Sequence, residues 1–248
     1  MQLYFIRHGQ SENNAIWLQD AYVDYRIADP LLTEQGKEQA RLLSEFLAVE
    51  HADAPEGRLD WQNRRGFGIT HMYCSLMERA VQTGAILSER LGIPLVGVPD
   101  LHELGGIYLE DEVDGVKTYQ ILHGRDRGYL NQNYPNLHLF AEISEGGWWR
   151  GGREERAIRM ERAHRMVEFL KDRHAGTEDR VAVVTHGAFF SYMFRVLLSL
   201  DLNYQGEKPL PYEIMYNNCG ITRFDLIEDE VVLMYHNRTD FLPAELVT

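Results

Sequence analysis

The stretch Val181-Ala182-Val183-Val184-Thr185-His186-Gly187 decides the fold. Its first four residues are all apolar, and an apolar run without polar alternation is typical of a strand covered on both faces of a parallel sheet. A second run of this kind, Leu3 to Ile6, ends at Arg7-His8-Gly9. The two predicted strands therefore have the same ending, a histidine followed by a glycine.

Helical spacings of three and four alternate with further short β-type runs along the chain. In the first half of the chain, the pattern predicts a helix that begins near Thr33 and has Ala40, Leu43, Phe46 and Leu47 on one face. A strand over 69–74, a helix over about 76–91 that ends at Gly92, and a strand over 94–98 are predicted to follow. The second half gives a long helix with Ile158, Ala163, Met166, Val167 and Leu170 towards the core, a helix over 189–200, and a hairpin of strands 221–226 and 231–236. Strands that alternate with helices predict an α/β fold with a largely parallel sheet.

Residues 104–150 do not follow this alternation. Glycine, asparagine, aromatic and charged residues mix there without a sustained period. We predict an insertion that packs over the core as a cap, with a local helix near 118–123. The 248 residues then form a single domain, within the usual size range.

Composition narrows the possible partners. With 25 basic and 38 acidic residues, the chain has a formal net charge of −13. A surface so acidic repels nucleic acids and anionic lipids, so we expect neither as a partner. The two cysteines, Cys74 and Cys219, are too few for a disulfide framework and are expected to be buried. Since neither a signal peptide nor a long apolar segment is recognised, the predicted location is cytoplasmic.

The chemistry is predicted at the carboxyl ends of the strands, where ligand sites of parallel sheets collect. His8 and His186 follow two such strands, and Arg79 lies at the start of the helix after a third. A single histidine or arginine at such a position is usually an ordinary surface or packed residue without a catalytic role. Together with Arg7 these three residues form a basic cluster in an acidic chain, a combination suited to a phosphoryl group.

These residues resemble the signature of the histidine phosphatase superfamily, in the branch of phosphoglycerate mutases and fructose-2,6-bisphosphatase-like enzymes. The resemblance rests on five segments in the family's order: Arg7-His8-Gly9-Gln10-Ser11 with Asn14, Leu31 to Gly36, Ser75 to Thr83, Leu101-His102-Glu103 and Thr185-His186-Gly187. It implies a three-layer sandwich with a mostly parallel central sheet, helices on both faces and an inserted cap.

The same resemblance implies the role of each residue. His8 is the nucleophile that forms a phosphohistidine, and Glu103 is the general acid and then the general base. Arg7, Arg79 and His186 hold the phosphoryl oxygens, with Asn14 and Gly187 as further phosphate-binding positions. The implied substrate is a small phosphate monoester, and neither a metal nor another cofactor is expected, since no ligand motif or Walker loop is present.

Three functions fit this pattern. The first is a phosphatase. The second is a cofactor-dependent phosphoglycerate mutase, but authentic mutases continue after the acid with a glutamate-arginine-x-tyrosine-glycine loop, whereas this chain has Glu103-Leu104-Gly105-Gly106. The third is a non-catalytic module that binds phosphorylated ligands, which the presence of both His8 and Glu103 argues against.

Several neighbouring residues are assigned structural roles. His102 is interpreted as a bystander, Trp148 and Trp149 as core of the insertion, and Arg150 and Arg153 as solvated. The arginines between 156 and 165 are expected on an exposed, ion-paired helix face. The acidic, aromatic loop over 15–30 is expected to rim the pocket. The identity of the phosphate ester and the oligomeric state cannot be predicted from the sequence.

Overall fold

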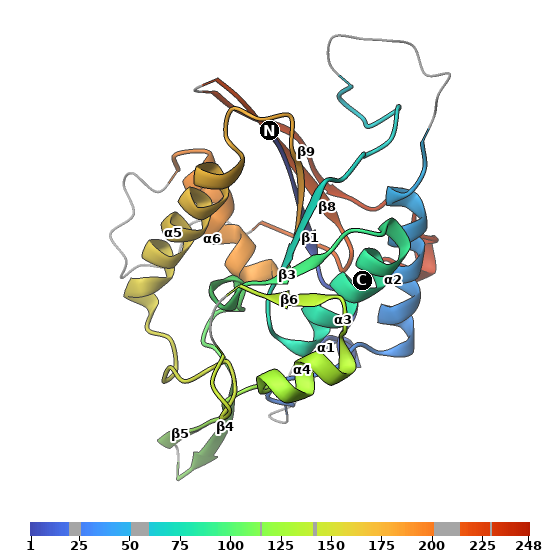
Figure 1. Ribbon diagram of the computed structural model, residues 1–248. Coiled ribbons are helices and arrows are strands. Elements are labelled where there is room, and N and C mark those ends of the chain that lie inside the picture. The colour runs from blue at the N-terminus through green and yellow to red at the C-terminus, as the bar shows by residue number, and fades with distance from the viewer. Residues whose placement is uncertain (20–25, 51–59, 115, 141–142, 201–213, 229) are drawn as a thin grey trace.

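The computed structural model describes residues 1–19, 26–50, 60–114, 116–140, 143–200, 214–228 and 230–248 (Figure 1). Its main strands are Gln2–Arg7 (β1), His71–Cys74 (β2), Leu95–Gly97 (β3), Leu137–Leu139 (β6), Arg180–Thr185 (β7), Ile221–Ile227 (β8) and Glu230–Arg238 (β9). They form one sheet in the order β6-β3-β2-β7-β1-β8-β9. The first five of these run parallel, and β8 and β9 add an antiparallel hairpin at the edge of β1. The mostly parallel sheet is confirmed.

Helices cover both faces of the sheet. Glu34–Leu47 (α2) and Glu78–Leu91 (α3) pack on one face, and Arg156–His174 (α5) and Gly187–Leu197 (α6) on the other (Figure 1). The alternation of side chains along β7 explains this arrangement, because Ala182 and Val184 belong to the core beneath α2 and α3, whereas Val181 and Val183 belong to the core beneath α5 and α6. The predicted three-layer sandwich is confirmed. Short helices at Glu12–Gln19 (α1) and Arg127–Asn133 (α4), and 3₁₀ turns at Pro99–Leu101 and Ala244–Leu246, complete the structure.

The start of α2 is fixed by its cap and by a close backbone approach. The hydroxyl of Thr33 accepts a hydrogen bond from the amide of Gly36 at 3.0 Å, as predicted for an N-cap. A Cβ on Gly36 would lie 2.0 Å from the carbonyl oxygen of Gln10, and one on Gly9 would lie 2.4 Å from the carbonyl oxygen of Gly36. These two glycines let the loop after β1 lie directly against the first turn of α2.

The predicted helix near 118–123 is wrong. Val116–Ile121 is a strand (β5) that pairs antiparallel with Tyr108–Val113 (β4) in a separate two-stranded sheet. Figure 1 shows this hairpin projecting from the body of the molecule. The stretch is rich in β-branched and aromatic residues, which lose rotamer freedom in a helix and pair well across a hairpin.

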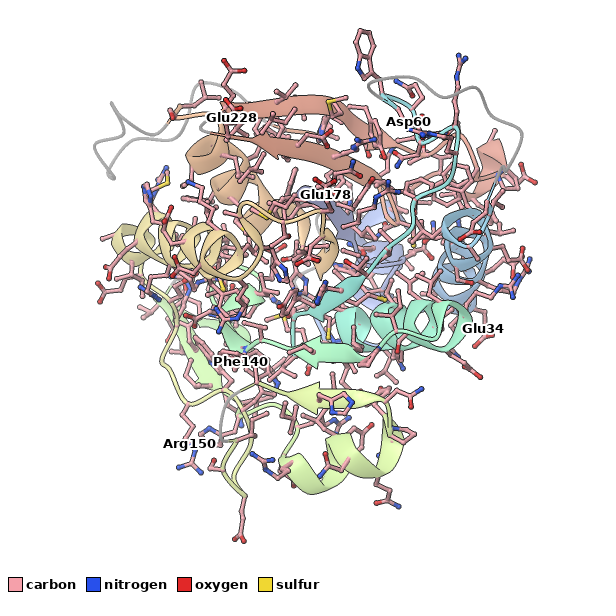
Figure 2. All side chains as sticks on the ribbon, turned by 45° about the horizontal axis from the view of Figure 1, so that its top comes forward. Glu34, Asp60, Phe140, Arg150, Glu178 and Glu228 are labelled. Atoms are coloured by element: carbon pink, nitrogen blue, oxygen red, sulfur yellow. The ribbon has the colours of Figure 1, made fainter. Side chains whose placement is uncertain are left out.

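Residues 104–150, predicted as an insertion, do not all lie outside the main sheet. Although β4, β5 and α4 lie outside the main sheet, β6 pairs with β3 and forms the edge of the central sheet. Trp148 is buried and Trp149 partly buried against the core, whereas Arg150 is exposed (Figure 2). These placements agree with the prediction for the tryptophans and for Arg150.

The long helix α5 differs from its prediction at two residues. Ile158 is 46% exposed, and Met160 packs in the core instead. Arg162, expected on the exposed face, is only 2% exposed. Its guanidinium binds the Glu154 carboxylate at 2.6 and 3.0 Å and donates to backbone carbonyls just before Glu103, those of Asp100 and His102. A buried arginine with a partner for each of these donors is a structural anchor, and here it fixes the loop that carries Glu103.

Two further expectations can be checked. Cys74 and Cys219 are both buried and unbonded to each other, as expected. Within the part of the chain that the structure describes, the helices are all too short or too polar to cross a membrane.

Candidate active site

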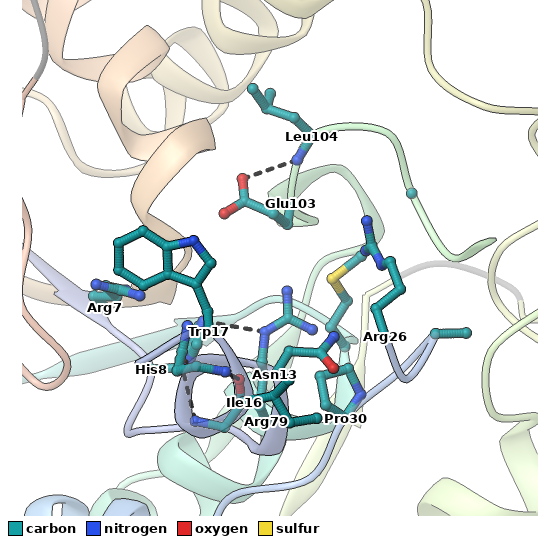
Figure 3. Close-up of a pocket in the computed structure, with 15 residues that line it drawn as sticks. Arg7, His8, Asn13, Ile16, Trp17, Arg26, Pro30, Arg79, Glu103 and Leu104 are labelled. Carbon is teal, nitrogen blue, oxygen red and sulfur yellow. Dashed lines mark hydrogen bonds between the residues drawn. The ribbon is translucent and has the colours of Figure 1, made fainter. Parts of the chain in front are cut away.

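The site lies beyond the carboxyl ends of β1, β2 and β7. Because β7 pairs in parallel with both β1 and β2, the residues that follow these three strands lie close together at the carboxyl end of the sheet. A pocket of about 280 Å³ opens there, large enough for a small ligand (Figure 3). Its lining residues include Arg7, His8, Ser11, Asn13, Asn14, Trp17, Arg26, Arg79, Glu103 and Leu104.

His8 is held in one protonation state. Its Nδ1 lies 2.7 Å from the carbonyl oxygen of Gly9, and since a carbonyl can only accept, Nδ1 carries the proton. Its Nε2 lies 3.1 Å from Nε of Arg79, and since a guanidinium can only donate, Nε2 presents its lone pair. Burial, followed by the positive charges of Arg79 and Arg7, holds the pKa of His8 well below its usual range. The imidazole is therefore neutral near pH 7, as a nucleophile requires.

Two arginines, Arg7 and Arg79, line the pocket together with His8. Arg79, in the first turn of α3, is 8% exposed and lies 3.9 Å from the carboxylate of Asp29. Arg7, the last residue of β1, donates to the backbone carbonyl of Tyr216, and its Nε has no hydrogen-bond partner among the described residues. Burial lowers the pKa of both guanidinium groups, which nevertheless stay charged at neutral pH. The pocket therefore has two cationic forks beside His8.

His186 is nearby but does not line the pocket. It is fully buried, with its ring centroid 5.1 Å from that of His8, and its Nε2 lies 2.8 Å from the hydroxyl of Ser75. Burial and the charge of Arg79 hold its pKa well below the ordinary histidine value. Its Nδ1 has no partner among the described residues. His186 is thus next to His8 but outside the pocket lining, whereas the resemblance implies that it holds a phosphoryl oxygen.

Glu103 lies across the cavity from His8 (Figure 3). One carboxylate oxygen accepts from the amides of Phe189 at 2.8 Å and Leu104 at 2.9 Å, and the other accepts from the amide of Ala188 at 3.2 Å. The first turn of α6, which follows His186 directly, therefore orients the carboxyl. An acid fixed opposite a neutral imidazole suits proton transfer to a leaving group.

The two remaining predicted residues have different positions. Asn14 lines the pocket, and its Oδ1 accepts from the amide and hydroxyl of Ser11 and from Asn218. Gly187 lies against Arg7, where an added Cβ would come 3.5 Å from Nε of that arginine. His102 is buried outside the pocket lining, consistent with its interpretation as a bystander.

Sequence reasoning missed several residues of the site. Asn218 donates to the carbonyl of His8 at 2.9 Å, and Thr83 accepts from the amide of Gly9 at 3.0 Å, so both brace the nucleophile. Arg26 lines the pocket mouth, with one nitrogen 3.1 Å from the hydroxyl of Tyr108. No local pattern marks these residues, because only the tertiary fold brings them to His8.

The loop over 15–30 rims the pocket, as predicted, through Ile16, Trp17, Arg26, Ala28 and Pro30. Trp17 is 65% exposed and, like Arg7, lines the pocket (Figure 3). The acidic and aromatic residues predicted between positions 20 and 25 lie outside the described residues. Among the residues that are described, the pocket contains no group of three metal-type ligands.

The sequence of this chain matches the model of a known protein family. The model of the histidine phosphatase superfamily (branch 1) matches residues 3–55 and 60–239. A relative from Enterobacter sp. (strain 638), named probable phosphoglycerate mutase GpmB, is 25% identical over 238 residues, which cover 92% of this chain and 86% of that protein. A protein of the same name from Yersinia pestis (strain Pestoides F) is 24% identical over 229 residues, with 92% and 86% covered.

Solved structures share the fold. A putative alpha-ribazole-5'-P phosphatase from Escherichia coli K-12 superposes with a TM-score of 0.56 at 18% identity, covering 96% of each chain. A mycobacterial glucosyl-3-phosphoglycerate phosphatase gives 0.55 at 19% identity, covering 96% of this chain and 99% of its own. The phosphoserine phosphatase of Entamoeba histolytica, solved with 3-phosphoglyceric acid, gives 0.54 at 18% identity, with 98% and 99% covered.

Proposed function

Because the chain belongs to branch 1 of the histidine phosphatase superfamily, we propose that it is a metal-independent phosphatase that hydrolyses a phosphate monoester through a phosphohistidine on His8. The observation that supports this most directly is the neutral His8, whose Nε2 lone pair accepts from Arg79, in a pocket that is also lined by Arg7 and Glu103. Two arginines provide fixed positive charge for the phosphoryl oxygens, whose charge spreads in the transition state.

In the first step, Nε2 of His8 attacks phosphorus and the bond from phosphorus to the ester oxygen breaks. Glu103, as the neutral acid, gives its proton to the departing oxygen and becomes a carboxylate. For this attack the phosphoryl oxygens must take over the Nε–H of Arg79, which otherwise occupies the lone pair of His8 at 3.1 Å. Binding of the substrate thus balances the positive charge of the two arginines and frees the lone pair of His8 Nε2 for attack.

In the second step, the Glu103 carboxylate removes a proton from water, and the resulting oxygen attacks the phosphohistidine. The bond from phosphorus to Nε2 breaks, inorganic phosphate leaves, and Glu103 is protonated again for the next cycle. Dividing the reaction at a histidine replaces one difficult displacement by two easier ones.

Hydrolysis is favoured over transfer by the residues beside the acid. Leu104 and Gly106 line the pocket next to Glu103, and neither has a polar side chain that would hold the dephosphorylated alcohol for return of the phosphoryl group. The names of the curated relatives support a phosphoglycerate mutase as the second candidate.

The alcohol part of the substrate is proposed to lie toward Trp17 and Arg26 at the pocket mouth. Arg26 and Ala28 also line a second hollow, with Ile107, Leu109 and Leu122 from the insertion. We therefore propose that residues 1–248 act as one catalytic domain in which 104–150 contributes to substrate choice.

The test is an assay of metal-free wild type and His8→Ala against a panel of phosphate esters, together with trapping of an acid-labile phosphoenzyme. His138→Ala serves as the control, because His138 is exposed on β6 and lies outside the pocket. We expect phosphate release and phosphoenzyme from wild type and the control, and neither from His8→Ala. Wild-type turnover by His8→Ala would contradict the mechanism. With 3-phosphoglycerate and bisphosphoglycerate, formation of 2-phosphoglycerate faster than phosphate would favour the mutase.

A further inference from the structure

Two histidines and a carboxylate lie close together at the other end of the sheet, where β2 and β7 begin. His71 is the first residue of β2, His174 is the last residue of α5, and Asp179 directly precedes β7. One ligand atom from each of the three lies within 4.8 Å of the others. The sequence analysis predicts no metal site, because these residues belong to no recognised spacing motif and are brought together only by the fold.

The carboxylate of Asp179 faces one histidine with each oxygen. Oδ2 lies 2.8 Å from Nδ1 of His174, and Oδ1 lies 3.8 Å from Nδ1 of His71. The ring of His71 also packs against that of His174, with the two centroids 4.7 Å apart, so both imidazoles lie beside the carboxylate of Asp179. Around a tetrahedral zinc ion with bonds of about 2.0–2.2 Å, neighbouring ligand atoms lie about 3.3 Å apart. The observed distances lie on either side of this value.

The surroundings orient the ligands in the manner of metal sites. The second nitrogen of His174, Nε2, lies 3.0 Å from the hydroxyl of Tyr73, which fixes the ring as an outer partner does for a metal-bound histidine. The backbone carbonyl of Asp179 accepts from the amide of Gln2 at 2.8 Å, so the loop before β7 is also anchored. His174 is buried, whereas His71 is exposed and has room to turn towards an ion.

We propose that His71, His174 and Asp179 bind one divalent transition-metal ion, such as Zn²⁺. Two imidazoles and one carboxylate favour zinc, cobalt, nickel or copper over magnesium and calcium, which prefer oxygen ligands. The ion would replace the proton between Nδ1 of His174 and Oδ2 of Asp179. Nδ1 of His71 would leave the hydroxyl of Thr70, which is now 2.9 Å away. Three protein ligands leave the fourth tetrahedral position for water or another donor.

This site is separate from the phosphate pocket. It lies at the amino ends of β2 and β7, whereas His8 and His186 follow the carboxyl ends, so about 20 Å of strand separates the two. The metal would join α5 to the sheet as a structural clamp and take no part in the transfer of the phosphoryl group.

The test is calorimetric titration of the untagged, EDTA-treated full-length chain with ZnCl₂, together with the visible spectrum on adding CoCl₂. We expect one ion per chain, a tetrahedral cobalt spectrum, no binding of Mg²⁺, and a Tm that rises by about 5 °C at saturating zinc. Tyr73→Phe is expected to weaken zinc binding about tenfold, because it removes the hydroxyl that orients the ring of His174. His71→Gln and Asp179→Asn are expected to weaken binding further.

His138→Gln is the matched control and is expected to bind zinc like wild type, because His138 is an exposed strand histidine that does not belong to the cluster and is separated from β2 by β3. Since His71 is exposed, its variant tests the site without disturbing the core, and circular dichroism of each variant checks the fold. Absence of saturable zinc binding by wild type, or wild-type affinity in His71→Gln, would overturn the proposal. Neither outcome depends on whether the chain is a phosphatase.

Discussion

Nε2 of His8 accepts a hydrogen bond from Nε of Arg79 at 3.1 Å, while Nδ1 of the same ring faces the carbonyl of Gly9. One arginine thus fixes the neutral tautomer of the histidine and stands in the place that a phosphoryl group has to enter. The hydrogen bond also makes the two residues dependent on each other, so a change in Arg79 alters both phosphate binding and the nucleophile.

Arg79→Lys keeps the positive charge but removes the Nε–H that faces His8 and the planar fork. We expect kcat to fall by about 10²–10³-fold, as for loss of a preorganised donor in a transition state. Steady-state kinetics with p-nitrophenyl phosphate checks this, with Arg90→Lys, in the last turn of the same helix, as the control. Wild-type kcat in the Arg79→Lys variant would show that charge alone is sufficient.

Glu103→Gln preserves the size of the side chain but cannot release a proton. We expect the rate with an alkyl phosphate to fall by about 10²–10⁴-fold. With p-nitrophenyl phosphate the first step should be much less affected, because that leaving group needs no protonation. Comparing phosphoenzyme formation for the two esters measures this, and an equal loss for both would assign Glu103 to positioning.

Arg26→Ala removes the cation at the pocket mouth. We expect KM to rise by about 10–100-fold for phosphate esters that carry a second anionic group, with little change for p-nitrophenyl phosphate. Arg153→Ala is a matched control, since Arg153 also stacks on Tyr108 but does not line the pocket. An equal rise in KM for both classes of ester would exclude a role of Arg26 in substrate choice.

Acid should destabilise the fold between pH 6 and 5. Burial keeps His8, His102 and His186 neutral in the folded protein, with the pKa of His102 lowered to about 4. In the unfolded chain these histidines gain protons below pH 6.5, so their contribution to stability is complete above that pH and is lost as pH falls. Burial raises the pKa of Asp29 to about 6, which acts in the opposite direction.

Three histidines outweigh one aspartate, so the free energy of unfolding should fall by about 2–3 kcal/mol from pH 6 to pH 5. Urea unfolding at the two pH values measures this change. In His102→Gln the fall should be smaller by about 1 kcal/mol. A pH-independent free energy of unfolding would show that the buried imidazoles gain protons without unfolding.

Gly36→Ala should destabilise the protein by about 1–3 kcal/mol, because its Cβ would lie 2.0 Å from the carbonyl of Gln10 and force the two backbones apart. Gly152→Ala is the control, since nothing lies within 4 Å of a Cβ there. Thermal unfolding of both variants tests this, and an unchanged Tm for Gly36→Ala would contradict the close approach.

The strands of the main sheet were largely predictable where apolar runs are unbroken, as at Leu3 to Ile6 and Val181 to Val184. The three-residue strand β6 is not predictable, because so short a segment has no period, and the helix predicted near 118–123 lies where the structure has β5. For the site, the sequence and its resemblance predict that Arg7, His8, Asn14, Arg79, Glu103, His186 and Gly187 share one pocket; the first five line it, whereas His186 and Gly187 do not. The sequence does not predict Asn218, and it places Arg26 only within the loop over 15–30 that rims the pocket, because the contacts of both residues depend on the tertiary fold.

The position of β7 between β1 and β2 has a consequence for how the chain is made. Both partners of β1 lie far along the sequence, at Arg180–Thr185 and Ile221–Ile227, so β1 leaves the ribosome long before either strand with which it pairs has been synthesised. Until then, its apolar residues and unpaired edges are exposed to aggregation. A nascent chain that ends before residue 180 therefore contains His8, Arg79 and Glu103 but not the strand that brings them together.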